Sequence, residues 1–220
     1  LADAQTGASR LKERDRNAGR TASLFCANIN FLTIANGGYS NFRMQSDPSF
    51  ILAEQFCAMR LHSINRSLAL VSPGTENFPS NVVQTCDKLP KAIHDNAPRS
   101  LQLDPGQLRD AMAHLLPSDP VEIEQLASTG AVCIGVGYQH DYADMVLASA
   151  RVMFALGYQR YSEVIGHHML HGIGQLQDAP HAISWYRYSL NSSQTDSRAR
   201  FEPASPERDA QLSEAFERLA

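Results

Sequence analysis

The segment that most constrains the fold is residues 162–190, SEVIGHHMLHGIGQLQDAPHAISWYRYSL, which has the pattern of two helices joined by a glycine turn. Apolar residues recur at helical spacing up to Leu170, and Gly172 follows where helices often end with positive φ. Asp178 can then cap a second helix, with Pro180 in its first turn. Two such helices cannot bury their apolar faces alone, so the hairpin requires helical neighbours.

A second copy of this pattern lies 37 residues upstream. That shift places residues 135–137, Gly-Val-Gly, on residues 172–174, Gly-Ile-Gly, and Asp141 on Asp178. Agreement in one register indicates a repeat, so a second glycine turn is expected at 135–137. A further shift upstream finds no glycine pair. The sequence therefore predicts one well-formed repeat and one degenerate repeat.

The downstream copy resembles the Sel-like repeat (SLR) family, short relatives of tetratricopeptide repeats. That family's pattern has a small-residue helix, a G-x-G-V turn, an aspartate and then A-x-x-W-Y. The matching residues are Gly172, Gly174, Asp178, Ala182, Trp185 and Tyr186, and their upstream counterparts include Gly135, Gly137 and Asp141. Ala148 and Ser149 replace the tryptophan and tyrosine upstream. The resemblance covers about a quarter of the chain and implies protein–protein scaffolding rather than one particular chemistry.

Helix-start signals recur outside the repeats. A capping side chain precedes a proline at Asp47-Pro48, Asp104-Pro105, Asp119-Pro120 and Ser205-Pro206. The predicted fold is all-α: a tetratricopeptide-like helical hairpin array (a short α-solenoid) with irregular N-terminal helices and a C-terminal capping helix. The expected parts are a polar leader at 1–20, a helical region at 21–128, repeats at 131–190, a linker at 191–204 and the capping helix at 205–220. Within the helical region, helices are expected from Thr21 to Asn36, after Asp47, and over 80–93, 105–116 and 120–128.

Composition and motifs exclude several classes of function. A net charge of −4 gives no electrostatic support to a nucleic-acid groove. An apolar content of 43% with 19% charged residues is typical of a globular chain, and no apolar run is long enough to span a membrane. Residues 135–137 lack the third glycine of a dinucleotide fingerprint, and no G-x-S-x-G elbow is present. No cofactor is therefore expected.

The four cysteines are Cys26, Cys57, Cys86 and Cys133, and none forms a C-x-x-C pair. Two disulfides and four buried thiols are both compatible with their spacing. Disulfides are favoured because members of the resembled family are often exported, and because the chain begins with Leu1 rather than methionine. A cleaved signal peptide and a simple chain boundary both explain that start.

Helix geometry suggests how the cysteines pair. The helix before Asn36 and the helix after Pro48 should run antiparallel, and the midpoint between Cys26 and Cys57 falls in the loop that connects them. The two sulfurs would then lie at the same height on neighbouring helices, within bonding reach. We therefore predict a disulfide between Cys26 and Cys57, which leaves Cys86 to pair with Cys133.

A metal site is the main alternative to a scaffold. His167, His168 and His171 form H-H-x-x-H, and imidazoles four residues apart on a helix can chelate zinc. The zinc-protease motif needs a glutamate beside its first histidine, where this chain has His168. Helix surface is thus the expected environment of these histidines, with His140, Asp141 and His181 as further ligands if a site exists.

The sequence thus favours a non-enzymatic protein-binding scaffold or adaptor, located in the periplasm or outside the cell. The family resemblance suggests a protein of the bacterial cell envelope, such as a subunit of a flagellar motor or secretion complex. Its partners would be proteins rather than nucleic acids. The alternative function is a metal-dependent enzyme that uses the histidine cluster.

Overall fold

The computed structural model describes residues 21–40, 47–96, 103–192 and 206–219, and all regular structure within them is helical, as predicted. No helix in these ranges is both long and apolar enough to cross a membrane. The predicted leader at 1–20 lies outside the described residues, as do Ser205 and nearly all of the linker.

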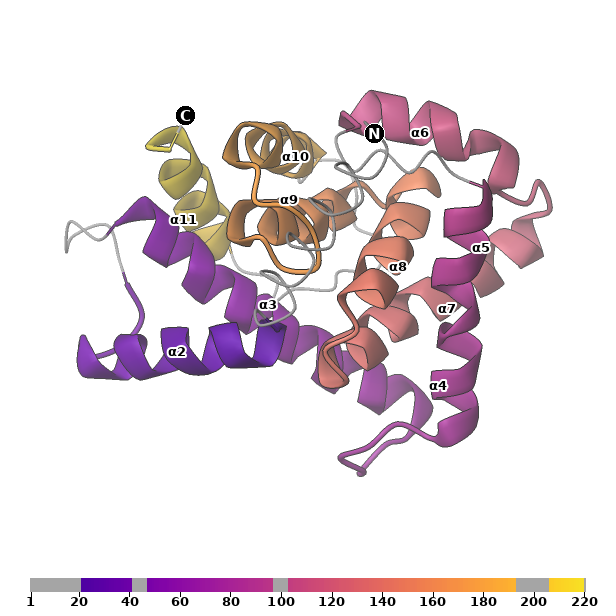
Figure 1. The fold of residues 1–220 in the computed structure, drawn as a ribbon, viewed down its shortest axis with the longest axis horizontal. Coiled ribbons are helices and arrows are strands. Elements are labelled where there is room, and N and C mark those ends of the chain that lie inside the picture. Colours follow the sequence, from indigo (N-terminus) through magenta and orange to yellow (C-terminus); the bar gives the residue numbers. More distant parts are fainter. Residues whose placement is uncertain (1–20, 41–46, 97–102, 193–205, 220) are drawn as a thin grey trace, which may run out of the picture.

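The 24-residue helix α3 (Pro48–Val71) is the central helix of the fold (Figure 1). Asp47 caps it by accepting the Ser49 N–H at 3.0 Å, and Pro48 occupies the first helical position. The helices that contact it are α2 (Ala22–Ala35), α7 (Pro120–Gln139), α9 (Ser162–His171) and α11 (Pro206–Glu217). The N-terminal helices and the helices of residues 120–192 therefore share one core around α3.

On the other side of the molecule, α4 (Ser80–Cys86), α5 (Lys88–Asn96) and α6 (Pro105–Met112) cover α7 and α8 (Ala143–Ala155). One continuous helix was expected over 80–93, but it is interrupted at Asp87. Pro90 explains the interruption, because its ring would clash with the Cys86 carbonyl in a continuous helix.

Two helical hairpins occupy the predicted repeat region. The first pairs α7 with α8, and the second pairs α9 with α10 (Ala179–Ser192). α7 does not end at 128 as expected but continues to Gln139, and the chain reverses at 140–142. The second hairpin reverses over the longer segment 172–178. The two hairpins therefore do not share one turn.

Gly135 and Gly137 lie inside α7, so the predicted glycine turn at 135–137 is wrong. A Cβ on Gly135 would lie 2.3 Å from Ser67 Oγ on α3, and one on Gly137 would lie 2.7 Å from Val146 Cγ2 on α8. These glycines allow neighbouring helices to approach α7 closely, which compensates the roughly 0.5–1 kcal/mol that a helical glycine costs.

The turn at residues 172–174 is present as predicted. Gly172 and Gly174 have φ values of 64° and 71°, and Ile173 between them is buried. Asp178 caps α10 by accepting the His181 N–H at 3.1 Å. The first part of α10 then faces the core, with Ala182, Trp185 and Tyr186 all buried.

Two disulfides connect the helices, and both are the pairs expected from the sequence. Cys26–Cys57 joins α2 to α3 with Cα atoms 5.4 Å apart, and Cys86–Cys133 joins α4 to α7 with Cα atoms 5.3 Å apart. Each disulfide fixes an outer helix to a helix of the core.

The last helix, α11, packs on α3 and α10 rather than only on the last hairpin (Figure 1). Its buried apolar residues are Leu212, Ala215 and Phe216. The predicted capping helix thus covers the central helix α3 as well as α10.

Candidate functional site

The three candidate metal ligands lie in the core rather than on the helix surface, so that expectation is wrong. His167 and His168 are completely buried, and His171 is 7% exposed. They belong to α9, which lies between α3, α8 and α10. The Phe56 ring of α3 contacts all three imidazoles, with centroid distances of 5.6, 5.6 and 5.7 Å.

His167 is the centre of a chain of buried polar groups. Its Nε2 lies 3.2 Å from Glu163 Oε1, and its Nδ1 lies 2.6 Å from the Tyr186 hydroxyl. Glu163 also accepts hydrogen bonds from Arg208 of α11, at 2.5 Å from Nη2 and 3.4 Å from Nη1. This network of hydrogen bonds therefore links α10, α9 and α11 through Tyr186, His167, Glu163 and Arg208.

The charge states of this chain follow from its surroundings. Burial alone would raise the pKa of Glu163, but the Arg208 charge and the hydrogen bonds from His167 and Arg208 hold that pKa far below its ordinary value. Burial lowers the pKa of His167 despite its bond to Glu163. Glu163 is thus ionised and His167 neutral, so Nε2–H donates to Glu163 while Nδ1 accepts from Tyr186.

His168 makes a second, separate pair of bonds. Its Nδ1 lies 2.8 Å from the Ile173 carbonyl oxygen, which can only accept, so Nδ1 carries the proton. Burial lowers the pKa of His168 to about 4, so the ring is neutral and its Nε2 accepts from the Tyr138 hydroxyl at 3.1 Å. The imidazole thereby fastens the 172–174 turn to α7.

The Glu163–His167–Tyr186 order resembles an acid–histidine–hydroxyl catalytic triad, but its setting suits a structural role. All three side chains are at most 2% exposed, so no substrate reaches the hydroxyl. Burial and the Glu163 charge raise the pKa of Tyr186 well above its ordinary value, which opposes the loss of its proton. The arrangement can hold helices together and fix a single packing.

The proposed metal ligands do not converge. Among the described residues, no three His, Cys, Asp or Glu side chains lie close enough together to hold a metal ion. His181 instead contacts Asp178 at 2.8 Å, and His140 stacks on Tyr142. Both ring nitrogens of His167 and of His168 already bond to protein groups.

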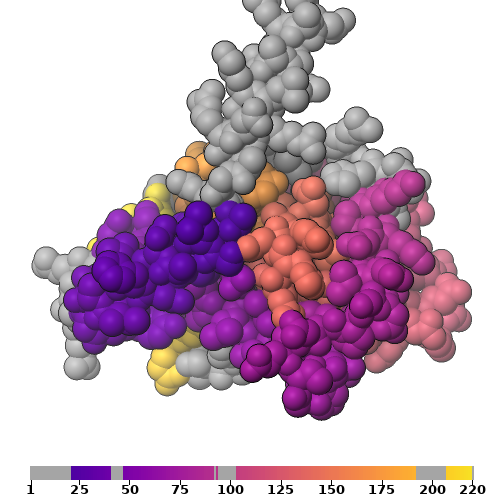
Figure 2. Space-filling view, turned by 60° about the horizontal axis from the view of Figure 1, so that its bottom comes forward, coloured from indigo at the N-terminus to yellow at the C-terminus, as the bar shows by residue number. Residues whose placement is uncertain are grey.

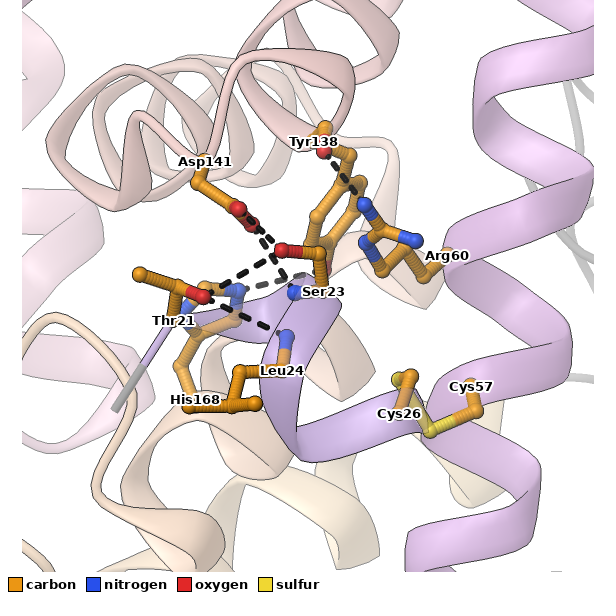
Figure 3. Close-up of a disulfide and its surroundings, with 9 residues drawn as sticks. All are labelled: Thr21, Ser23, Leu24, Cys26, Cys57, Arg60, Tyr138, Asp141 and His168. Atoms are coloured by element: carbon orange, nitrogen blue, oxygen red, sulfur yellow. Dashed lines mark hydrogen bonds between the residues drawn. A yellow bond between two sulfur atoms is a disulfide. The ribbon is translucent and has the colours of Figure 1, made fainter. Parts of the chain in front are cut away.

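Asp141, which the sequence comparison placed as the upstream counterpart of Asp178, bonds to the N-terminus of α2. It has a positive φ of 56°, and its carboxylate accepts hydrogen bonds from the backbone N–H of Ser23, at 2.9 Å, and from the Ser23 hydroxyl (Figure 3). Together with the Cys26–Cys57 disulfide, this anchors the first turns of α2 to the rest of the fold. Thr21 completes the N-terminus by accepting the Leu24 N–H at 3.3 Å.

The outer face of α2 is an apolar surface that the sequence patterns did not indicate. α2 lies at the edge of the fold and along the surface of the molecule (Figures 1 and 2). Leu24, Phe31 and Ile34 are 54%, 72% and 78% exposed, and none of the 14 residues of the helix is charged. Tyr39, just beyond the helix, is also exposed. The absence of charge from a helix at the protein surface was the signal that could have revealed it.

No family model matches this chain, and no curated protein or solved structure is significantly similar to it.

Proposed function

We propose that this protein is a non-enzymatic, protein-binding subunit of an assembly in the bacterial cell envelope, related to the Sel-like and tetratricopeptide-like repeat proteins. The observation that carries the proposal is the uncharged, apolar outer face of α2. A helix at the protein surface normally carries charged residues on its outer side, yet α2 covers the core with one side and leaves Leu24, Phe31 and Ile34 exposed on the other.

The anchoring of α2 supports its use as a binding surface. Cys26 is bonded to Cys57, and Ser23 is bonded to Asp141, so the helix is fixed at its first turns. Binding to a fixed helix costs less conformational entropy than binding to a helix that must first become ordered. The buried polar groups around His167 hold α9, α10 and α11 together, and we assign them a structural role rather than a chemical one.

Two disulfides are consistent with an oxidising compartment outside the cytoplasm. We therefore assign the protein to the periplasm or the cell exterior. The resemblance of Gly172, Gly174, Asp178 and the alanine, tryptophan and tyrosine of α10 to the Sel-like pattern supports the same assignment, since that family supplies adaptors to envelope assemblies.

The test is co-purification from envelope extract with the oxidised full chain as bait. Phe31→Ser should reduce the recovery of bound protein at least tenfold, because it removes the most apolar exposed ring of α2. The matched control is Val121→Ser, which changes a 63%-exposed apolar residue on α7. Equal recovery by wild type, Phe31→Ser and Val121→Ser would contradict the proposal.

A further inference from the structure

The exposed apolar residues of α2 have the spacing of a coiled-coil seam. Leu24, Ala27, Phe31 and Ile34 are separated by three, four and three residues, and all four are exposed. This is the a–d–a–d spacing with which two helices pack against each other. Leu24 and Phe31 occupy a positions, and Ala27 and Ile34 occupy d positions.

The opposite side of α2 has a seam that the fold already uses. Ala22, Cys26, Ile29 and Thr33 are buried, and the helix packs on α3 along this side. At 100° per residue the two seams point in nearly opposite directions. α2 therefore has the residues to pack against two helices. Within the described residues, α3 packs against the buried seam.

We propose that the second neighbour is α2 of another copy of this chain, packed antiparallel across a two-fold axis at the height of Ile29. This inference rests on the proposed function and names the partner of the same surface. In this arrangement Leu24 faces Ile34 of the second copy, and Ala27 faces Phe31 of the second copy. Each large ring thus meets a small residue, whereas a parallel pair would set Phe31 against Phe31 and Ala27 against Ala27.

The polar residues beside the seam are also self-complementary. Asn28 and Asn30 are exposed on the two sides of the seam, at e and g positions. An antiparallel pair brings each of them near the same residue of the second copy. An amide carries both donors and acceptors, so asparagine can bond to asparagine, whereas a charged side chain at either position would meet its own charge.

Charge favours a second copy over a charged partner. The chain has a net charge of −4, while the 14 residues of α2 carry no charge. Two copies therefore meet with least repulsion at α2. An acidic or basic partner would find no opposite charge on this helix.

The small size of the seam is typical of a weak dimer. A 14-residue helix is about 21 Å long and about 10 Å wide, so two copies bury roughly 1,000 Å² or less in total. That area lies at the low end of specific interfaces. We therefore expect a reversible dimer whose population rises with concentration, rather than a permanent one.

The first test is sedimentation equilibrium of the oxidised full chain from about 1 µM to about 1 mM, a range that covers weak complexes. The average mass of the wild type should rise toward twice that of one chain. Phe31→Asp should weaken association at least tenfold, while Val121→Asp should leave it unchanged. A single-chain mass of the wild type at every concentration would overturn the proposal, as would equal association of Phe31→Asp.

The second test determines the relative orientation of the two helices without changing a residue of the seam. In the antiparallel pair, Asn28→Cys places two thiols about 3 Å apart along the helix axis, whereas Ala35→Cys places them about 18 Å apart. Both variants carry one free thiol each, since the native cysteines are paired in disulfides. A short bismaleimide should therefore cross-link Asn28→Cys into a dimer and leave Ala35→Cys monomeric. The reverse result, or no cross-linking of either, would overturn the antiparallel pair.

These tests separate the inference from the proposed function. If the wild type stays monomeric but Phe31→Ser still loses co-purified protein, the second copy is wrong and the binding surface stands. If Phe31→Ser retains both its dimer and its bound proteins, both proposals fail.

Discussion

Helices α9 and α2 reverse the usual distribution of polar and apolar residues. All ten residues of α9 are buried, although they include Glu163 and three histidines. α2 carries no charge, yet Leu24, Phe31 and Ile34 are each more than half exposed. The two helices have different roles. α9 holds the fold together with polar bonds in the interior, and α2 keeps apolar surface available outside.

The difference follows from how each helix is satisfied. The side chains of Glu163, His167 and His168 find partners on α7, α10 and α11 and in the 172–174 turn. Buried polar groups are stable only when such bonds are complete. The exposed apolar side chains of α2 have no hydrogen-bonding groups and so need no polar partners. Their exposure to water instead favours burial against another apolar surface. Substitutions in the two helices should therefore have opposite consequences for stability and association.

The largest loss of stability is expected from Glu163→Ala. It leaves Arg208, whose side chain is 7% exposed, without its buried carboxylate and also removes the acceptor of His167. The free energy of unfolding should fall by about 3–5 kcal/mol in urea denaturation. Replacing both partners, Glu163→Leu with Arg208→Met, should cost less than the single change. A loss below about 1 kcal/mol for Glu163→Ala would show that the charge pair is not buried.

The second-largest loss of stability is expected from removal of one disulfide, which also tests the anchoring of α2. Cys26→Ser with Cys57→Ser opens a link with a sequence separation of 31 and should cost about 3–4 kcal/mol. Cys86→Ser with Cys133→Ser, with a separation of 47, is the matched control and should cost a similar amount. Only the first pair should also weaken association in sedimentation, because it releases α2 from α3. Equal association of both variants would mean that the seam does not depend on this anchor.

Acid should destabilise the protein through α9. Burial lowers the pKa of His168 to about 4 in the fold, from 6.5 in an unperturbed side chain. Above pH 6.5 both the folded and unfolded states are neutral at this residue, and the full stability is present. Between pH 6.5 and 4 only the unfolded chain binds the proton, so stability falls by up to about 3 kcal/mol and then levels off for this residue. His167, whose pKa is also lowered, adds in the same direction.

The measurement is urea denaturation at intervals from pH 7.5 to 4. His168→Asn cannot take a proton and should show a shallower decline across this range than the wild type, although it is less stable at pH 7.5. Parallel curves for the two proteins would show that His168 does not cause the decline.

A smaller effect is expected at the turn after α9. Gly172→Ala forces an L-residue into positive φ and should cost about 1–2 kcal/mol. Gly174→Ala should cost more, because its Cβ would also lie 2.2 Å from the Ala143 Cβ. Ala179→Gly, in the first turn of α10, is the control and should cost less than 1 kcal/mol. Thermal melts that rank Ala179→Gly below Gly174→Ala in stability would contradict the turn geometry.

These features differ in how far the sequence could predict them. The pairing of Cys26 with Cys57 was predictable because an antiparallel helix pair is a local arrangement fixed by one loop. The turn at 172–174 was predictable because its glycines are followed by a capping aspartate and a proline. In contrast, Gly135 and Gly137 give the same signal for a turn and for a close helix crossing, and only the position of Ser67 and Val146 distinguishes the two.

The burial of α9 could not be predicted for a related reason. His167 and His168 look like surface residues because the tyrosine hydroxyls that bond to them lie far away along the chain. Tyr186 is 19 residues from His167, and Tyr138 is 30 residues from His168. Local periodicity carries no information on such distant partners. The same periodicity identified α2 as a helix but not which apolar side faces α3, because both sides have helical spacing.

The smallest loss of stability is expected on the outer face of α2, and it completes the comparison. Phe31→Ser changes a 72%-exposed ring, so the free energy of unfolding should change by no more than about 0.5 kcal/mol. Ile29→Ser, two residues away on the side that faces α3, removes a side chain that is 9% exposed and should cost at least about 2 kcal/mol. Association should show the opposite order at protein concentrations where both variants are folded: Phe31→Ser loses it, and Ile29→Ser retains it. A Phe31→Ser protein that is as destabilised as Ile29→Ser would mean that this ring belongs to the core of the monomer, and that α2 has no free face to offer a second copy.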